Sequence, residues 1–162
     1  MLSFCGQDKC SVDANGRIKL SPRNLSDFAE QGAGEVVLRF LPEGAIAVYP
    51  EDIYLQMRRN EPRPAERAAA SLVFRRSLRH FGALSQSEKI SPQGRITIPP
   101  AYREYAALGP GSEAVVIGVE IGLEIWNTER WAEELTKVNE HIREKGEREM
   151  ADDLMGRPGA GQ

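Results

Sequence analysis

The chain repeats one short turn motif, and this repetition limits the folds that it can adopt. Residues 13–22 read DANGRIKLSP, and residues 91–100 read SPQGRITIPP. When the two Gly-Arg pairs are aligned, the neighbouring apolar residues and the final proline recur at the same positions. The similarity continues in the same order through residues 35–50 and 113–127, each of which contains two apolar runs. We interpret this pattern as an internal duplication, in which each copy is too small to bury a core on its own.

Each copy follows the pattern of two strands, a short helix and two further strands. In the first copy, residues 9–13 are expected to form a strand, and residues 17–20 alternate apolar and charged side chains as a half-buried strand does. Ser21 is a good helix N-cap, Pro22 suits the first helical position, and Gly32 is expected to end the helix. The sequence therefore predicts an α+β, mainly β fold, in which two β-β-α-β-β units pair about a pseudo-twofold axis and close a small barrel.

The duplication also predicts how the chain is divided. A helical pattern separates the two copies, and a charged helical pattern with Thr128 as its expected N-cap follows the second copy. The residues from Met155 onward are expected to be disordered. The expected segments are the first copy at residues 3–60, a helical linker at 61–84, the second copy at 85–135, and a charged C-terminal helix with its tail at 136–162.

Several classes of protein lack support in the sequence. The N-terminus has no basic stretch before an apolar one, so we expect no signal peptide, and the longest apolar run, at residues 114–126, is too short to span a membrane. Cys5 and Cys10 have no partner pattern of a metal site. His80 and His141 lie far apart, and no motif of a nucleotide-binding or hydrolytic enzyme is present. We therefore expect no enzyme activity, no metal, no cofactor and no small-molecule substrate.

The charge is distributed unevenly along the chain. The net charge is −3, which by itself argues against a polyanionic partner. The acidic excess lies from Glu129 to the C-terminus, however, and a basic face is compatible with it because a polyanion responds to the local potential. The linker is rich in arginine, and we expect a solvated helix face there rather than a DNA contact. These arginines are Arg58, Arg59, Arg63, Arg67, Arg75, Arg76 and Arg79.

The duplicated Gly-Arg pair is the candidate binding site. Glycine permits a positive φ, and the arginine after it projects from the turn. Because a guanidinium binds phosphate and guanine in a bidentate manner, two such turns on one face suit a polyanion. For a single turn, the alternative is a structural ion pair, as between Asp13 and Arg17. Arg23 and Arg103 could enlarge the positive patch. The predicted DNA-binding residues are Lys9, Asn15, Gly16, Arg17, Lys19, Lys89, Gln93, Gly94 and Arg95, and Asp13 and Ser91 are expected to support the turns.

Three longer motifs connect the chain to a known family. They are the D-x-x-x-R turn at residues 13–17, the GRITIPPAYREYAAL segment at 94–108, and the segment from VVIG to LEIWNTERW at 115–131. Over about residues 3–135 the chain resembles the MraZ family of bacterial transcriptional regulators, relatives of the AbrB-type swapped-hairpin DNA-binding domains. In the second copy Ser91 stands in place of the family's acid, so its hydroxyl could cap the turn but no Asp–Arg pair can form.

The resemblance implies a function that the residues alone do not reach. It implies a swapped-hairpin barrel and a regulator of a cell-division and cell-wall gene cluster, associated with the nucleoid in the bacterial cytoplasm. It also implies a ring-shaped homo-oligomer, without membrane contact, that binds direct repeats in promoter double-stranded DNA. Two alternatives stay open: an antitoxin-like module that binds a protein toxin, and a structural interaction protein that has lost DNA binding.

Overall fold

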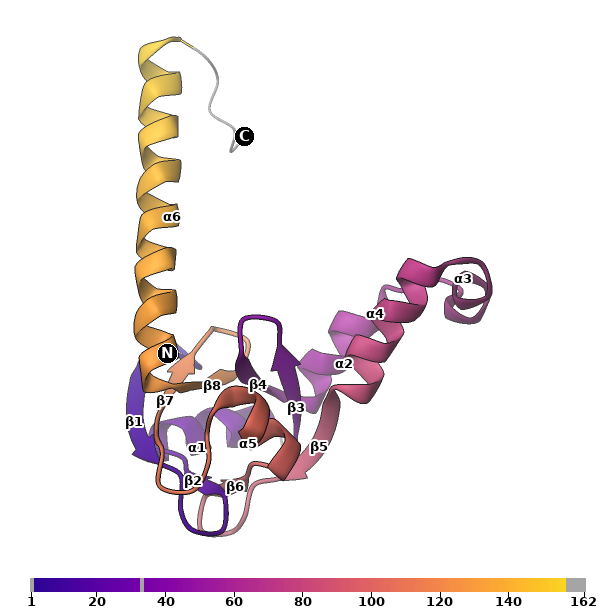
Figure 1. Ribbon diagram of the computed structural model, residues 1–162, viewed down its shortest axis with the longest axis vertical. Helices are drawn as coiled ribbons and strands as arrows, with labels where there is room; N and C mark the ends of the chain where they lie inside the picture. Colours follow the sequence, from indigo (N-terminus) through magenta and orange to yellow (C-terminus); the bar gives the residue numbers. More distant parts are fainter. Residues whose placement is uncertain (1, 33, 157–162) are drawn as a thin grey trace. The chain divides into compact units, whose positions relative to one another are not determined.

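The computed structural model describes residues 2–32 and 34–156. The chain forms two units, Met1–Asn127 and Thr128–Gln162 (Figure 1). The first unit is α+β and consists mainly of sheet. The second contains one long helix, α6 (Thr128–Leu154), which covers residue 136, where a boundary was expected from the sequence. Residues 157–162 of the tail expected to be disordered lie outside the described residues.

The two copies contain matching elements in the same order. The first copy consists of β1 (Gln7–Ser11), β2 (Arg17–Lys19), α1 (Pro22–Glu30), β3 (Glu35–Leu41) and β4 (Ala45–Pro50). The second consists of β5 (Ser85–Lys89), β6 (Arg95–Thr97), α5 (Pro100–Ala106), β7 (Glu113–Gly118) and β8 (Leu123–Asn127). Between them lie α2 (Glu51–Arg59), α3 (Pro64–Ala70) and α4 (Leu72–Ala83).

Local sequence explains where the helix of the first copy begins and ends. The Ser21 side chain accepts a hydrogen bond from the backbone N–H of Asn24 at 3.2 Å, and Pro22 occupies the first turn, which confirms the expected cap. After α1 the chain reaches Gly32, whose φ is +67°. This left-handed conformation favours glycine, so the helix ends where the sequence predicted.

The strands of the two copies interleave in the main sheet. Its order is β1-β7-β8-β4-β3-β5, and every neighbouring pair is antiparallel. When each strand is exchanged for its counterpart in the other copy, the same order results, read from the opposite edge of the sheet. Since β1 pairs with β7 and β5 pairs with β3, each copy completes the sheet of the other. The edge strand of each copy finds its pairing partner only in the other copy, so neither copy can complete the sheet alone.

Both copies contribute to one hydrophobic core. It is built from side chains of the sheet, of α1 and α5, and of the short strands β2 and β6. Tyr49 and Trp126 are buried in the first unit, as expected from their equivalent positions, whereas Tyr54 and Trp131 are only partly buried. The largest fully buried side chains include Phe4, Ile18, Leu20, Phe28, Ile46, Ile96, Ile98, Leu108, Leu123 and Ile125.

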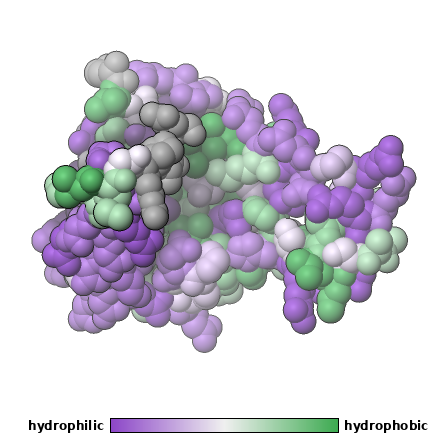
Figure 2. All heavy atoms as spheres, turned by 90° about the horizontal axis from the view of Figure 1, so that it is seen from above, coloured by the Kyte–Doolittle hydropathy of each residue, from purple (hydrophilic) through white to green (hydrophobic). Residues whose placement is uncertain are grey.

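The linker forms a helical arm of α2, α3 and α4 on the first unit (Figure 1). Several of its arginines are engaged inside the arm: the Arg58 guanidinium lies 3.8 Å from the centre of the Phe81 ring, and Arg67 stacks on Phe74. Apolar side chains are visible at the end of the arm in Figure 2, where Leu72 and Val73 are exposed. None of the described helices is both long enough and apolar enough to cross a bilayer.

Candidate nucleic-acid interface

The two Gly-Arg turns meet in a two-stranded ribbon. β2 pairs with β6 in antiparallel register, with Ile18 opposite Ile96. The ribbon is extended at both ends by hydrogen bonds, from the Leu20 N–H to the Gly94 carbonyl and from the Ile98 N–H to the Gly16 carbonyl, each at 2.9 Å. Segments far apart in the sequence therefore lie side by side at one end of the first unit (Figure 1).

The two faces of this ribbon differ in character. Ile18 and Ile96 are buried and anchor the inner face to the core. Because side chains alternate along a strand, the residues on either side of each isoleucine share the outer face. There Lys19 lies opposite Arg95, and Arg17 lies opposite Thr97. The outer face thus carries three cations on four positions, and both arginines are partly exposed.

The first turn is held by the Asp13 carboxylate. Its Oδ1 accepts hydrogen bonds from the backbone N–H groups of Asn15 and Arg17, both at 2.9 Å, and its Oδ2 accepts one from Arg17 Nε at 3.2 Å. The predicted ion pair is therefore confirmed. The backbone N–H of Arg17 contributes most to lowering the pKa of Asp13, and the neighbouring charge adds to it. Gly16 has φ +76°, which explains the glycine.

The second turn has the same backbone with a different cap. The Ser91 hydroxyl accepts a hydrogen bond from the Arg95 N–H at 3.0 Å, which confirms the capping role expected for it. Backbone hydrogen bonds from Ser91 to Arg95 and from Gly94 to Ser91 repeat those of the first turn. The φ of Gly94 is +79°. Because serine carries no charge, Arg95 has no acidic partner within its own turn, whereas Arg17 does.

We expect Asp13→Asn to lower the stability of the protein in a pH-dependent way. The folded-state pKa of Asp13 lies below its unfolded value, so its contribution is fully present above the unfolded value of about 4 and is lost as the pH falls through the folded pKa. The difference in melting temperature between wild type and variant should be widest near neutral pH and should close in acid. Thermal unfolding followed by circular dichroism at several pH values tests this.

Ser91→Ala is the matched control, because it removes the equivalent cap without removing an ionisable group. Its effect on the melting temperature should be independent of pH over the same range. A difference between wild type and Asp13→Asn that stayed constant down to the most acidic pH would contradict the assignment of the pKa shift to this turn.

The other predicted cations lie outside the ribbon. Lys9 is on β1 and Lys89 is on β5, the two edge strands at opposite ends of the main sheet. Lys89 lies 3.8 Å from Glu35, and Arg23 forms an ion pair with Asp8 at 2.9 Å. The structure brings together Arg17, Lys19, Arg95 and the turn residues Asn15, Gly16, Gln93 and Gly94 in the ribbon, whereas Lys9 and Lys89 lie on the edge strands of the main sheet.

Two residues of the ribbon region were not among the predicted contacts. Thr97 shares the outer face because it is the counterpart of Lys19, which the repeat alignment could have shown. Arg103 of α5 donates a hydrogen bond to the Asn15 carbonyl at 3.4 Å, across the boundary between the copies. The sequence marked Arg103 only as a flanking cation, since a contact between different copies depends on the tertiary fold.

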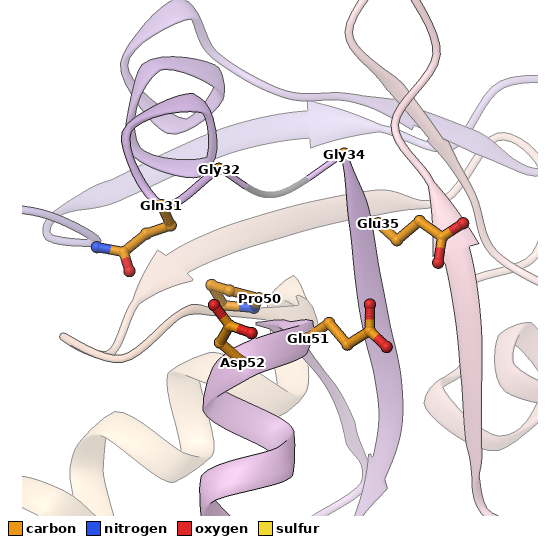
Figure 3. A pocket seen from close by; sticks show the side chains of 7 residues that line it. All are labelled: Gln31, Gly32, Gly34, Glu35, Pro50, Glu51 and Asp52. Carbon is orange, nitrogen blue, oxygen red and sulfur yellow. The ribbon is translucent and has the colours of Figure 1, made fainter.

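A hollow of the surface near α1 is unsuited to a polyanion. It has a volume of about 280 Å³ and lies between the end of α1, the start of β3 and the start of α2 (Figure 3). Carboxylates of Glu35, Glu51 and Asp52 line it, so its potential repels phosphate. Within residues 2–32 and 34–156, no cluster of three acidic, histidine or cysteine side chains could hold a metal ion.

Similarity to known proteins assigns the chain to a family. The fold is that of an α+β protein with an interleaved main sheet and a separate two-stranded ribbon that carries the paired arginine turns. The family model described as "MraZ protein, putative antitoxin-like" matches residues 86–154. The chain belongs to the MraZ family, as its similarity to curated relatives over most of their length shows.

Three of these relatives are named "Transcriptional regulator MraZ". The relative from Arthrobacter sp. is 36% identical over 138 residues, which cover 83% of this chain and 88% of the relative. The relative from Thermus thermophilus is 30% identical, covering 82% and 88%. The one from Corynebacterium kroppenstedtii is 31% identical, covering 79% and 83%. A solution structure from Pyrococcus horikoshii covers 77% of this chain and 89% of that chain at 13% identity, and its TM-score of 0.30 is too low to support an argument.

Proposed function

We propose that this protein is a sequence-specific DNA-binding transcriptional regulator, and that the outer face of the β2–β6 ribbon is its DNA-binding surface. The observation that carries the proposal is the pairing that puts Arg17, Lys19 and Arg95 on one exposed face. A two-stranded ribbon fits the major groove, and arginine is the side chain most often used to bind guanine there. The relatives named as transcriptional regulators support the same function.

The fold that we propose for this function is a pseudo-twofold swapped-hairpin barrel. The support is the strand order, which is unchanged when the two copies are exchanged, and the pairing of each edge strand with the opposite copy. The repeats at residues 3–60 and 85–135, the linker at 61–84 and the C-terminal segment at 136–162 are part of this proposal. Such a scaffold fixes two turns on one rigid element, so their spacing is defined before DNA binds.

The overall negative charge is compatible with DNA binding at the ribbon. The net charge is −3, and much of the acid lies on α6, which belongs to the second unit. Within the ribbon, the only carboxylate in either turn is Asp13, and it is paired with Arg17. The potential felt by a phosphate at the outer face is therefore set by local cations.

The proposed target is double-stranded promoter DNA with direct repeats, upstream of a cell-division and cell-wall gene cluster in the bacterial nucleoid. A gel-shift titration with the DNA upstream of the protein's own gene, repeated at several salt concentrations, tests the function. We expect the logarithm of the binding constant to fall linearly with the logarithm of the salt concentration, with a slope of about −0.9 for each neutralised phosphate. Absence of binding at low salt, or equal binding to unrelated DNA, would contradict sequence-specific recognition.

We further propose that the protein acts as a ring-shaped homo-oligomer. One chain offers two turns and few phosphate contacts, so tight binding requires several chains joined on tandem sites. Head-to-tail contacts between identical chains close into rings and present each chain to DNA in the same orientation, which suits direct repeats. The exposed Leu72 and Val73 on the arm are apolar surface available for such contacts.

Two measurements test the assembly. Light scattering should give a mass several times that of the chain's 18.0 kDa. Binding to DNA with several repeats should be much tighter than binding to a single repeat, because later contacts become intramolecular. A monomer in solution that binds one repeat as tightly as several repeats would contradict the proposed ring.

A further inference from the structure

The two turns differ in the side chain that covers their glycine. At the first turn, Arg103 of α5 lies against Gly16 and donates from Nη1 to the Asn15 carbonyl at 3.4 Å. A Cβ added to Gly16 would lie 1.3 Å from Arg103 Nη1 and 2.4 Å from its Cζ. The guanidinium therefore rests directly on the glycine, in space that any other residue at position 16 would fill.

At the second turn, the same place is taken by a leucine. A Cβ added to Gly94 would lie 2.6 Å from Leu25 Cδ1, and Leu25 belongs to α1. The two positions are equivalent in structure as well as in sequence. The backbone N–H of Leu25 donates to the carbonyl of Ser21, and that of Arg103 donates to the carbonyl of Pro99. Both acceptors are the residue directly before the proline that begins the helix. The copies thus place an arginine on one turn and a leucine on the other.

Arg103 is available to bind an anion. Within residues 2–32 and 34–156, no carboxylate forms an ion pair with it. Its one side-chain hydrogen bond in this part of the chain goes to a backbone carbonyl, so most of its five N–H donors are left for a ligand. The side chain is only partly buried. The first turn therefore combines two guanidinium groups, those of Arg17 and Arg103, whereas the second turn has that of Arg95 alone.

We propose that Arg103 contacts a DNA phosphate and makes the first turn the stronger of the two DNA-binding turns. This inference rests on the proposed function of the ribbon. Because the arginine comes from α5 and reaches the end of the ribbon, its guanidinium lies beside the ribbon strands rather than on them. A ribbon in a groove is flanked by the phosphates of both DNA strands, and guanidinium binds phosphate in a bidentate manner.

The consequence is a defined orientation of the chain on its site. A unit with two identical turns would bind equally well after rotation about its pseudo-twofold axis, and it would suit a palindrome. A unit with Arg103 on one turn and Leu25 on the other makes more phosphate contacts at one end. Such a unit binds in one direction, as a target made of direct repeats requires.

The test exchanges the two side chains. Arg103→Leu places a leucine on Gly16, as in the second turn, and Leu25→Arg places an arginine on Gly94, as in the first turn. The double variant reverses the wild-type arrangement. We expect Arg103→Leu to weaken binding to the duplex from upstream of the gene by roughly 5- to 10-fold and to lower the salt slope by about 0.9. Leu25→Arg should raise both the affinity and the slope.

Ethylation interference on the same duplex locates the contact. Wild type should show an additional essential phosphate at one end of the site, Arg103→Leu should lose it, and the double variant should show one at the other end. Melting temperatures of all variants establish that they are folded, and Arg103→Lys, which keeps the charge, should retain most of the salt slope. If Arg103→Leu fails to fold, Leu25→Arg still tests the inference on its own.

The outcomes separate this inference from the proposed function. Folded variants that bind with wild-type affinity, salt slope and interference pattern would overturn the role of Arg103 while leaving the ribbon as the DNA-binding surface. An Arg103→Leu variant that binds more weakly but keeps the wild-type salt slope and interference pattern would also overturn it. In that case Arg103 would only support the turn, and its replacement would remove no phosphate contact. Failure of wild type to bind the duplex would instead refute the proposed function.

Discussion

Replacement of both Arg17 and Arg95 by alanine is expected to abolish specific DNA binding. Each arginine that contacts a base edge contributes roughly 1–3 kcal/mol, so each single variant should bind about 5- to 150-fold more weakly. In the ribbon, Arg17 lies opposite Thr97 and Arg95 lies opposite Lys19, so the arginines are not direct partners. Their effects should add, to about 2–6 kcal/mol for the double variant. Fluorescence anisotropy at one fixed salt concentration measures this.

The two single variants should lose different amounts of binding affinity. The Asp13 carboxylate holds Arg17 through a 3.2 Å contact to Nε, so its side chain is already ordered before DNA binds. Arg17→Ala also leaves that carboxylate without its partner, close to the DNA phosphates. Arg95→Ala uncovers no acid, because Ser91 stands at the equivalent position. We therefore expect Arg17→Ala to weaken binding more than Arg95→Ala.

Arg143→Ala is the matched control, since it removes the same charge from an exposed position on α6, outside the first unit. Its affinity should stay near that of wild type. If both ribbon variants bound like this control, the assignment of the ribbon as the DNA-binding surface would be wrong, whatever the wild-type affinity.

The local parts of the fold could be predicted because local chemistry decides them. The alternation in residues 17–20, the cap at Ser21 and the glycine at position 32 each select one conformation from neighbouring residues alone. The same holds for the turns, where Asp13 and Ser91 bond to the arginine four residues later. These interactions span few residues, so their partners can be identified from spacing.

The pairing between the copies could not be derived in the same way. That β1 pairs with β7, and β2 with β6, depends on which edges the two copies bury against each other. The duplication indicates that the copies pair, but it leaves the register open. The engagement of Lys89 with Glu35, and of Arg103 with the first turn, follows from that register. The predicted DNA-binding residues therefore included two lysines outside the ribbon, and Arg103, which covers Gly16, was predicted only as a flanking cation.

Gly118→Ala is expected to cause a large loss of stability in the first unit. Gly118 ends β7, and the N-terminal segment crosses directly over it. A Cβ at this position would lie 2.2 Å from the backbone carbon and oxygen of Phe4 and 2.3 Å from the nitrogen of Cys5. These atoms belong to the main chain and cannot rotate away, so the segment itself must move.

That movement would undo several interactions at once. The Gly118 N–H bonds to the Gly6 carbonyl, and the Glu120 N–H bonds to the Phe4 carbonyl, both at 2.9 Å. The Phe4 ring is buried against Phe28, and the backbone N–H of Phe4 donates a hydrogen bond to the Asp27 carboxylate at 3.0 Å. Loss of two backbone hydrogen bonds at about 1 kcal/mol each, with partial exposure of one phenylalanine, gives roughly 3–5 kcal/mol.

A loss of this size is a large share of the 5–15 kcal/mol typical of a folded domain. Urea unfolding followed by tryptophan fluorescence measures it, since Trp126 is buried in the first unit. Gly82→Ala is the control: nothing lies within 4 Å of a Cβ there, and alanine in α4 should leave stability unchanged or raise it by up to about 1 kcal/mol. Equal unfolding midpoints for the two variants would show that the N-terminal segment is not held against Gly118 in solution. Because that segment continues into β1, which pairs with the second copy, a severe Gly118→Ala defect would also indicate that the interleaving of the copies depends on it.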